Sequence, residues 1–128
     1  MSLDEIREIL NAAVITDQAS LRKPIESVYC ADLMSDVLSF SVAGCLLVTG
    51  LTNAQVIRTA EMAAIDMIVF VQGKRPAVQT IRLAEEKNIP LLVTDLAMFE
   101  TCGRLYEKGL RSHSASLGQT SIVTCHEG

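Results

Sequence analysis

Four short polar segments each follow a run of apolar residues, and they carry the side chains best suited to bind a small ligand. The segments are Asp32–Asp36, Thr49–Asn53, Gln72–Arg75 and Thr94–Asp95. Together they offer hydroxyls, amides, carboxylates and cations, and the free N–H groups of a following helix bind phosphate or carboxylate well. The residues that we predict to contact a small anionic ligand or nucleotide are Asp32, Ser35, Thr49, Gly50, Thr52, Asn53, Gly73, Lys74 and Thr94.

Several residues of these four segments also have a purely structural explanation. Thr52 and Asp95 can cap the helices that follow them, because their side-chain oxygens accept hydrogen bonds from free backbone N–H groups. Gly50 and Gly73 can serve only to make turns, and Lys74 can be a solvated loop charge. The residue types therefore indicate a ligand site without naming its ligand.

Motifs for common enzyme chemistry are absent from the sequence. It has no GxxxxGK[ST] phosphate loop and no GxSxG nucleophile turn. The two histidines, His113 and His126, both lie in the polar C-terminal tail, so a Ser–His or Cys–His pair in the core would lack its base. Asp32 and Asp36 could serve acid–base chemistry or bind Mg²⁺, although a negative charge at a helix start is the simpler explanation. Cys125 beside His126 does not by itself make a zinc site. We predict no catalytic residue, metal site or cofactor.

Composition and charge narrow the classes of partner. The chain has 128 residues, the size of one domain, and a net charge of −4. Its lysines and arginines are scattered, so the basic stripe that binds nucleic acid is missing. No apolar run is long enough to span a bilayer, and the N-terminus does not read as a signal peptide. The sequence therefore predicts a cytoplasmic domain with neither nucleic acid nor membrane as its partner.

The cysteines fit the same location. There are four of them, without CxxC spacing: Cys30, Cys45, Cys102 and Cys125. We interpret them as reduced thiols. The first three lie in apolar stretches and are expected to be buried as small apolar side chains.

The elements that position the polar segments follow from the apolar pattern. Short apolar runs alternate with stretches of helical spacing. We expect strands at 12–16, 25–30, 45–49, 66–71 and 89–94. We expect helices after the Ser2–Glu5 capping box, over 32–39, and in the stretches that begin at Thr52, Pro76 and Asp95. The strands are apolar on both faces, which is typical of parallel strands covered by helices.

The fold class predicted is therefore α/β, a mainly parallel sheet flanked by helices and built from consecutive strand–helix units. In such sheets ligands bind beyond the carboxyl ends of the strands. We call this edge the rim, and it should gather the four polar segments named above. Residues 1–110 are expected to form a single domain. Residues 111–128 are a polar tail in which Ser121–Thr124 could add an edge strand.

Five segments between Ser27 and Leu110 carry residues that occur together in one known family. They are Tyr29–Leu38 (YCADLMSDVL), Leu47–Thr49 with Thr52, Ile68–Phe70 through Gly73 and Pro76, Ala84–Leu92, and Phe99–Tyr106. The combination resembles the DRTGG domain, in particular its short stand-alone form. The DRTGG string itself is absent, and Asn53 and Gln55 stand where stand-alone members tend to have His and Asn.

The resemblance implies an α/β fold and a regulatory or associative role. DRTGG domains occur as accessory segments in phosphotransacetylases and in pyrophosphatases that also have CBS domains. Stand-alone forms are found in anaerobes beside iron hydrogenase genes, which implies a metabolic enzyme such as a hydrogenase as partner. The sequence thus predicts a non-catalytic regulatory domain, a homodimer that binds a small anionic ligand or nucleotide at the rim. The alternatives are an interaction or dimerisation module without a small ligand, and a metal-dependent phosphate-processing enzyme that uses Asp32 and Asp36.

Overall fold

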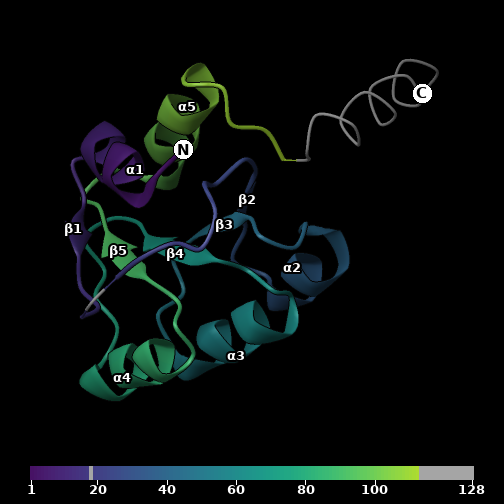
Figure 1. Ribbon diagram of the computed structural model, residues 1–128, viewed down its shortest axis with the longest axis vertical. Coiled ribbons are helices and arrows are strands. Elements are labelled where there is room, and N and C mark those ends of the chain that lie inside the picture. The colour runs from purple at the N-terminus through teal and green to yellow at the C-terminus, as the bar shows by residue number, and fades with distance from the viewer. Residues whose placement is uncertain (18, 113–128) are drawn as a thin grey trace.

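The computed structural model, which describes residues 1–17 and 19–112, alternates strands and helices along the chain (Figure 1). The strands are β1 (Ala13–Val14), β2 (Val28–Cys30), β3 (Leu46–Thr49), β4 (Met67–Phe70) and β5 (Leu91–Val93). The helices are α1 (Leu3–Leu10), α2 (Met34–Phe40), α3 (Ala54–Met62), α4 (Val78–Glu86) and α5 (Met98–Glu107). The strands form one sheet in the order β1-β5-β4-β3-β2. Only β1 is antiparallel to its neighbour, so the predicted α/β class with a mainly parallel sheet is confirmed.

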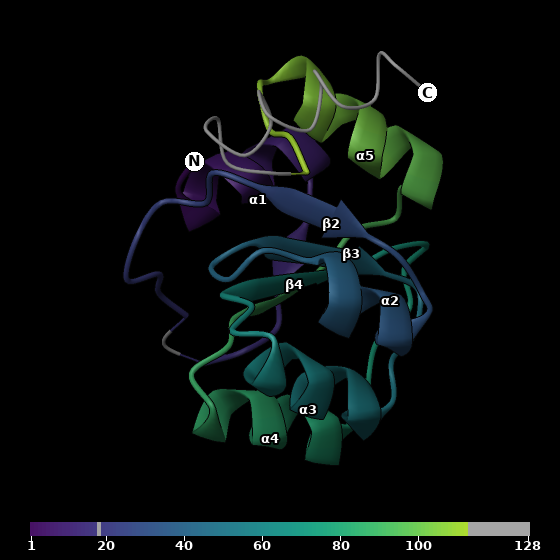
Figure 2. The same ribbon diagram turned by 90° about the vertical axis from the view of Figure 1, so that its right-hand side faces the viewer.

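Helices cover both faces of the sheet, as Figures 1 and 2 show: α1 and α5 lie on one face, and α3 and α4 on the other with α2 near the β2 edge. Successive side chains of a strand point to opposite faces. Leu46 and Met67 therefore join the core under α1 and α5, whereas Leu47 and Ile68 join the core under α2, α3 and α4. All four are completely buried. Burial on both faces explains why the strands are apolar throughout.

The parallel register brings the carboxyl ends of four strands to one edge. Cys30 of β2 lies opposite Val48 of β3, and Thr49 lies opposite Phe70 of β4. Phe70 in turn lies opposite Val93 at the end of β5. The loops that follow β2, β3, β4 and β5 consequently emerge side by side at the rim.

The capping box predicted near the N-terminus is confirmed. Ser2 and Glu5 form the capping box of α1, in which the Glu5 carboxylate accepts from Ser2 N at 3.0 Å and the Ser2 hydroxyl accepts from Glu5 N at 3.1 Å. The hydrogen bond from Ser2 N, followed by the effect of the Ser2 hydroxyl on the carboxylate, lowers the pKa of the Glu5 carboxyl. Asn11 ends the helix in the left-handed conformation with φ of 48°, which Asn tolerates better than most residues.

Three predicted helix starts are wrong by one or two residues. Asn53, and not Thr52, caps α3, because its side-chain oxygen accepts a hydrogen bond from Gln55 N at 3.1 Å. Helix α4 begins at Val78, so Pro76 precedes the cap residue instead of occupying the first turn.

Asp95 does not cap α5, which begins only at Met98 after a cap residue without a side-chain hydrogen bond. The chain between β5 and α5 does not enter the helix earlier because its carbonyls pair with the neighbouring loop. Thr94 O accepts from Gly73 N and Leu96 O accepts from Gln72 N, both at 2.8 Å. A loop–loop contact thus delays the helix.

The first strand–helix unit also differs from the prediction. Strand β2 begins at Val28, because Ile25 is held instead by the N-terminus through a hydrogen bond from its N–H to Met1 O at 2.6 Å. The spacing of Leu33, Val37 and Leu38 places them on one side of the helix predicted over 32–39. Only Val37 is buried, whereas Leu33 and Leu38 are 61% and 45% exposed. This short helix lies near the edge of the sheet, where only one turn reaches the core.

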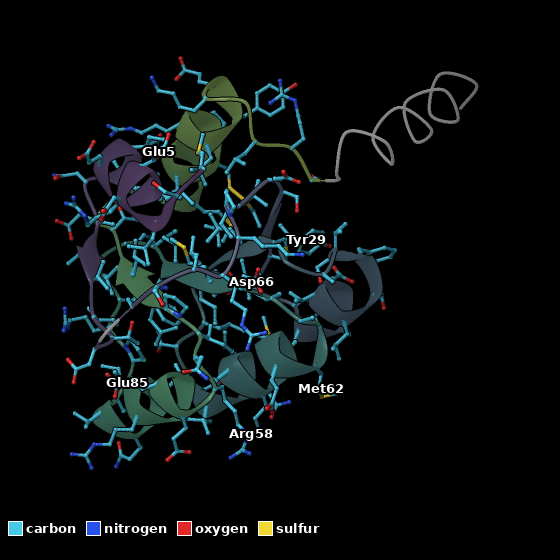
Figure 3. All side chains as sticks on the ribbon, in the orientation of Figure 1. Glu5, Tyr29, Arg58, Met62, Asp66 and Glu85 are labelled. Atoms are coloured by element: carbon cyan, nitrogen blue, oxygen red, sulfur yellow. A yellow bond between two sulfur atoms is a disulfide. The ribbon has the colours of Figure 1, made fainter. Side chains whose placement is uncertain are left out.

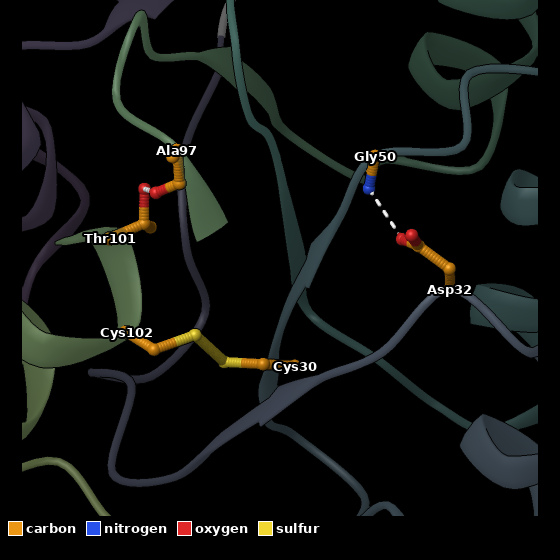
Figure 4. The surroundings of a disulfide bond; sticks show 6 residues. All are labelled: Cys30, Asp32, Gly50, Ala97, Thr101 and Cys102. Carbon is orange, nitrogen blue, oxygen red and sulfur yellow. Dashed lines mark hydrogen bonds between the residues drawn. A yellow bond between two sulfur atoms is a disulfide. The ribbon is translucent and has the colours of Figure 1, made fainter. Parts of the chain in front are cut away.

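The prediction of reduced thiols is wrong for two cysteines. Cys30 at the end of β2 and Cys102 on α5 form a disulfide, and both are only partly buried (Figure 4). They lie 72 residues apart in the sequence, and α5 covers the face toward which Cys30 points. Cys45 is free and completely buried as predicted, and burial raises the pKa of its thiol to about 11. Cys125 and the expected strand at Ser121–Thr124 lie outside the described residues.

No helix within residues 1–17 and 19–112 combines the length and the apolar character that crossing a bilayer requires. Of the tail predicted from residue 111 onward, the structure describes Arg111 and Ser112. Arg111 O accepts a hydrogen bond from Val28 N at 2.8 Å. The described start of the tail therefore runs along the outer side of β2.

Candidate ligand-binding rim

Asp32 is the centre of the rim. It follows β2 by two residues, and its carboxylate reaches the loop after β3 (Figure 4). One carboxylate oxygen, Oδ1, accepts a hydrogen bond from Gly50 N at 2.7 Å and another from the Thr49 hydroxyl at 3.0 Å. Hydrogen bonds to an ionised acceptor are stronger than those between neutral groups. The structure thus brings together three of the residues predicted to bind a ligand.

Lys74 completes this cluster from the loop after β4. Gly50 leaves a gap of about the size of a methyl group where a side chain would begin: a Cβ atom there would be in ordinary van der Waals contact with Asp32 Oδ1, 3.5 Å away, and with Lys74 Nζ, 3.6 Å away. Among the described residues the Lys74 ammonium makes no ion pair within 4 Å. The space above Gly50 is therefore bounded by a carboxylate on one side and an unpaired ammonium on the other.

The two threonines of the rim have hydroxyls that are already engaged. Thr49 is completely buried, and its hydroxyl donates to Asp32 while accepting from Leu51 N at 3.2 Å. Thr94 is 1% exposed, and its hydroxyl donates to Leu10 O at 2.7 Å while accepting from Leu96 N at 3.3 Å. Thr94 thereby ties the end of β5 to the end of α1. A ligand can use either hydroxyl only by displacing one of these partners.

The remaining predicted residues lie around this cluster. Gly73 has φ of +67°, in the left-handed region, and its N–H donates to Thr94 O. Asn53 uses its side-chain oxygen for the α3 cap, and Thr52 beside it is partly buried. Ser35 is exposed in the first turn of α2. The Gly73 N–H and the Asn53 side chain are thus already engaged. The hydroxyls of Thr52 and Ser35 make no hydrogen bond within the described part of the chain.

Asp36 acts on Tyr29 through its charge. Burial raises the pKa of the Tyr29 hydroxyl, and the negative charge of Asp36 raises it further. Figure 3 shows Tyr29 emerging from the sheet near α2. Within residues 1–17 and 19–112, no three His, Cys, Asp or Glu side chains lie close enough together to hold a metal ion.

Two hollows lie at the opposite edge of the sheet, around the loop between β1 and β2. One of about 360 Å³ is lined in part by Arg22, Asp66 and Lys87, and another of about 530 Å³ also includes Arg22 and Asp66. Glu85 of α4 accepts a hydrogen bond from Asp17 N at 2.7 Å and holds this loop against the helix (Figure 3). The charges in these hollows are of both signs, and no sequence signal distinguished them from solvated loop residues.

Comparison with known proteins defines the family. The model of the DRTGG domain matches residues 5–107. The chain belongs to the DRTGG domain family. The predicted resemblance is thereby confirmed at the level of the family. No curated protein matches the sequence at a significant level.

A solved structure with the same fold contains another DRTGG domain. It is the crystal structure of the CBS and DRTGG domains of the regulatory region of Clostridium perfringens pyrophosphatase, complexed with its activator diadenosine tetraphosphate. The TM-score is 0.64 at 20% sequence identity, and the match covers 79% of this chain and 44% of that one. At this identity the likeness establishes the fold of the DRTGG domain, and this chain spans less than half of the solved regulatory region.

Proposed function

We propose that this DRTGG domain is a non-catalytic regulatory domain that binds a nucleotide, or a related small anionic ligand, at the rim. The observation that carries the proposal is the space above Gly50, with Asp32 on one side and the Lys74 ammonium on the other. Membership in the DRTGG family supports a regulatory role, because the similar domain in the clostridial pyrophosphatase belongs to a regulatory region.

The two charges favour a nucleotide over a bare anion. Within the described residues, Oδ1 of Asp32 accepts both protein hydrogen bonds and Oδ2 accepts none. Oδ2 is therefore free to accept from a hydroxyl of the ligand, as a carboxylate does with ribose in dinucleotide-binding folds. The Lys74 ammonium is suited to a phosphate. A ligand with both hydroxyls and phosphates satisfies both groups, whereas a bare anion would be repelled by Asp32.

We propose a non-catalytic role because the threonine hydroxyls at the rim are buried and already hydrogen-bonded. A nucleophilic hydroxyl needs an accessible oxygen and an adjacent base. Thr49 and Thr94 are buried, and each donates its proton to a structural partner. The alternative of a phosphate-processing enzyme needs Asp32 and Asp36 to share a metal, and one carboxylate oxygen of Asp32 is already held by hydrogen bonds from Thr49 and Gly50.

The test is nucleotide binding with matched variants at the rim. Calorimetry and thermal shift with AMP, ATP and diadenosine tetraphosphate should find at least one nucleotide that binds and raises the melting temperature. Lys74→Ala should weaken that binding at least tenfold, and Asp32→Asn should weaken it while keeping the side-chain shape. Arg75→Ala is the control, because Arg75 is the neighbouring exposed cation. Failure of all three nucleotides to bind, or equal losses at Lys74 and Arg75, would overturn the proposal.

Dimerisation is a second candidate role, favoured by the exposed apolar side chains of α2 and its cap residue. Leu33 is 61% exposed and Phe40 is 60% exposed, beside the β2 edge of the sheet. We propose a second copy of this chain as the partner, which makes the domain a homodimer. Light scattering should then give twice the chain mass, and Phe40→Ser should give the monomer. A monomeric wild-type protein at high micromolar concentration would rule out this interface.

The stand-alone subtype, the hydrogenase partner and the cytoplasmic location stay predictions from the sequence. They can be tested together by purifying the tagged protein from cytoplasmic extract of its native cells. Mass spectrometry should then identify a metabolic enzyme that co-purifies in stoichiometric amount. Its absence from repeated purifications would contradict the partner, and recovery only from another fraction would contradict the location.

A further inference from the structure

The Cys30–Cys102 disulfide lies directly beside the rim. Cys30 is the last residue of β2 and precedes Asp32 by two residues. Figure 4 shows that the chain segment that starts at Cys30 leads to Asp32, whose carboxylate accepts the hydrogen bond from Gly50. The Cα atoms of the two cysteines are 7.0 Å apart. One half of the disulfide therefore belongs to the segment that places the Asp32 carboxylate.

The other half of the disulfide is connected to the segment that places Lys74. Cys102 lies on α5, and the chain that leads into α5 accepts two hydrogen bonds from the loop after β4. These run from Gln72 N and Gly73 N, both at 2.8 Å, and Gly73 is the neighbour of Lys74. The disulfide thus links the two sides of the space above Gly50 through short stretches of chain.

The two cysteines of the disulfide are more accessible to solvent than Cys45, the other cysteine in the described part of the chain. Cys30 and Cys102 are both partly exposed, at the border of the core under α1 and α5. Cys45 is completely buried in the core on the opposite face of the sheet. A thiolate from solution can therefore reach the disulfide, whereas Cys45 cannot serve as the attacking group in the folded protein. In a cytoplasmic setting, accessible disulfides are usually transient.

We propose that the Cys30–Cys102 disulfide is a reversible switch by which a thiol/disulfide couple sets the ligand affinity of the rim, an inference that rests on the proposed function. A low-molecular-weight thiolate attacks one sulfur and forms a mixed disulfide, and the other cysteine leaves as a thiolate. A second thiolate releases the first cysteine. Two thiols thus give two electrons and two protons to the protein, which gains two Cys–SH groups, and the couple leaves as its disulfide. The reverse exchange restores the link.

The oxidised form is the one that binds more tightly. The link limits how far the β2–α2 connection can move relative to α5, so Asp32 and Lys74 keep the spacing that a ligand needs, and binding costs less ordering. The fold itself does not depend on the link alone. Strand β2 stays paired with β3, and Val28 N still donates to Arg111 O. Reduction should therefore loosen the rim while the sheet remains intact.

The experiment follows the rim with and without a ligand, in a Cys125→Ser background that removes the thiol outside the described residues. The protein is equilibrated in buffers of reduced and oxidised glutathione, and free thiols are counted by mass spectrometry. Backbone amide NMR signals of Gly50 and Lys74 report the rim, and that of Asn88 at the opposite edge is the control. Calorimetry with the nucleotides named above gives the dissociation constant in each state.

We expect the disulfide to titrate reversibly and the Gly50 and Lys74 signals to shift on reduction while Asn88 does not. The dissociation constant should rise at least fivefold on reduction. The double variant Cys30→Ser/Cys102→Ser should behave like the reduced protein and ignore glutathione. A disulfide that never forms, rim signals that do not respond, or equal affinities in both states would overturn the switch. If no nucleotide binds but the rim signals respond, the proposed function fails while the redox coupling stands.

Discussion

Reducing the Cys30–Cys102 disulfide should cost a large part of the domain's stability. The two cysteines are separated by 72 residues. In the chain-entropy model, a cross-link that closes a loop of this length removes roughly 15 cal/mol/K of entropy from the unfolded chain, which is about 4 kcal/mol at 25 °C. Small domains are typically stable by about 5–15 kcal/mol in total. The free energy of unfolding should therefore fall by a quarter or more when the disulfide is reduced.

Urea denaturation measures this change directly. Because the chain has no Trp, far-ultraviolet circular dichroism is a better signal than fluorescence. With a slope of about 2 kcal/mol per M for a small protein, the loss should lower the denaturation midpoint by about 2 M. The double variant Cys30→Ser/Cys102→Ser should match the reduced wild type. Cys125→Ser is the control, since Cys125 takes no part in this disulfide, and it should leave the oxidised midpoint unchanged.

The reasoning would be refuted by one clear outcome. If mass spectrometry shows the disulfide formed, and reduction still moves the midpoint by less than about 0.3 M, the link does not constrain the unfolded chain as the entropy model requires. A fall of more than about 6 kcal/mol would also contradict the reasoning, because it would mean that the native contacts between β2 and α5 are lost along with the link.

Further predictions concern single residues. Thr94→Val removes the hydroxyl that donates to Leu10 O, so urea denaturation should show a loss of about 1–3 kcal/mol, which Thr94→Ser largely avoids; an unchanged midpoint for Thr94→Val would contradict this role. Gly73→Ala forces a side chain to adopt φ of +67° and should cost about 1–2 kcal/mol in the same assay. Cys45 should resist iodoacetamide at pH 8 in the native protein and react in urea, as peptide mapping would show; native labelling would disprove its burial. Because burial raises the pKa of Cys45 from 9.0 to about 11, the unfolded chain ionises first, so stability should fall as pH rises from about 9 to about 11, and Cys45→Ala should remove this part of the pH dependence.

The architecture was predictable because it is encoded in neighbouring residues. Leu46 and Leu47 point to opposite faces of the sheet, and both are buried, so an unbroken apolar run is sufficient to indicate a strand covered on two sides. The capping box of Ser2 and Glu5 spans a single turn and was recognisable for the same reason. Such signals need no knowledge of the tertiary structure.

The features that sequence reasoning missed all depend on contacts between distant segments. The late start of α5 follows from the hydrogen bonds that Gln72 and Gly73 donate to the chain after β5. The disulfide joins Cys30 to a helix that passes over the same face of the sheet, and sequence spacing carries no record of that geometry. The exposure of Leu33 arises because α2 lies near the edge of the sheet, which depends on the strand order.

The rim depends both on signals between neighbouring residues and on contacts between distant segments. The residue types at the rim were predictable from the loops that follow the apolar runs, but the contact between Asp32 and Gly50 was not. That contact changes the chemistry expected there. A ligand that used only the Gly50 N–H would have to displace a carboxylate that the chain itself holds in place at 2.7 Å. Within the described residues, Oδ2 of Asp32 accepts no hydrogen bond and the Lys74 ammonium makes no ion pair, so a ligand that approaches these two groups displaces no such partner. The geometry therefore argues for a ligand with both hydroxyl and phosphate groups, and for a response that passes through the β2–α2 connection when Asp32 is engaged.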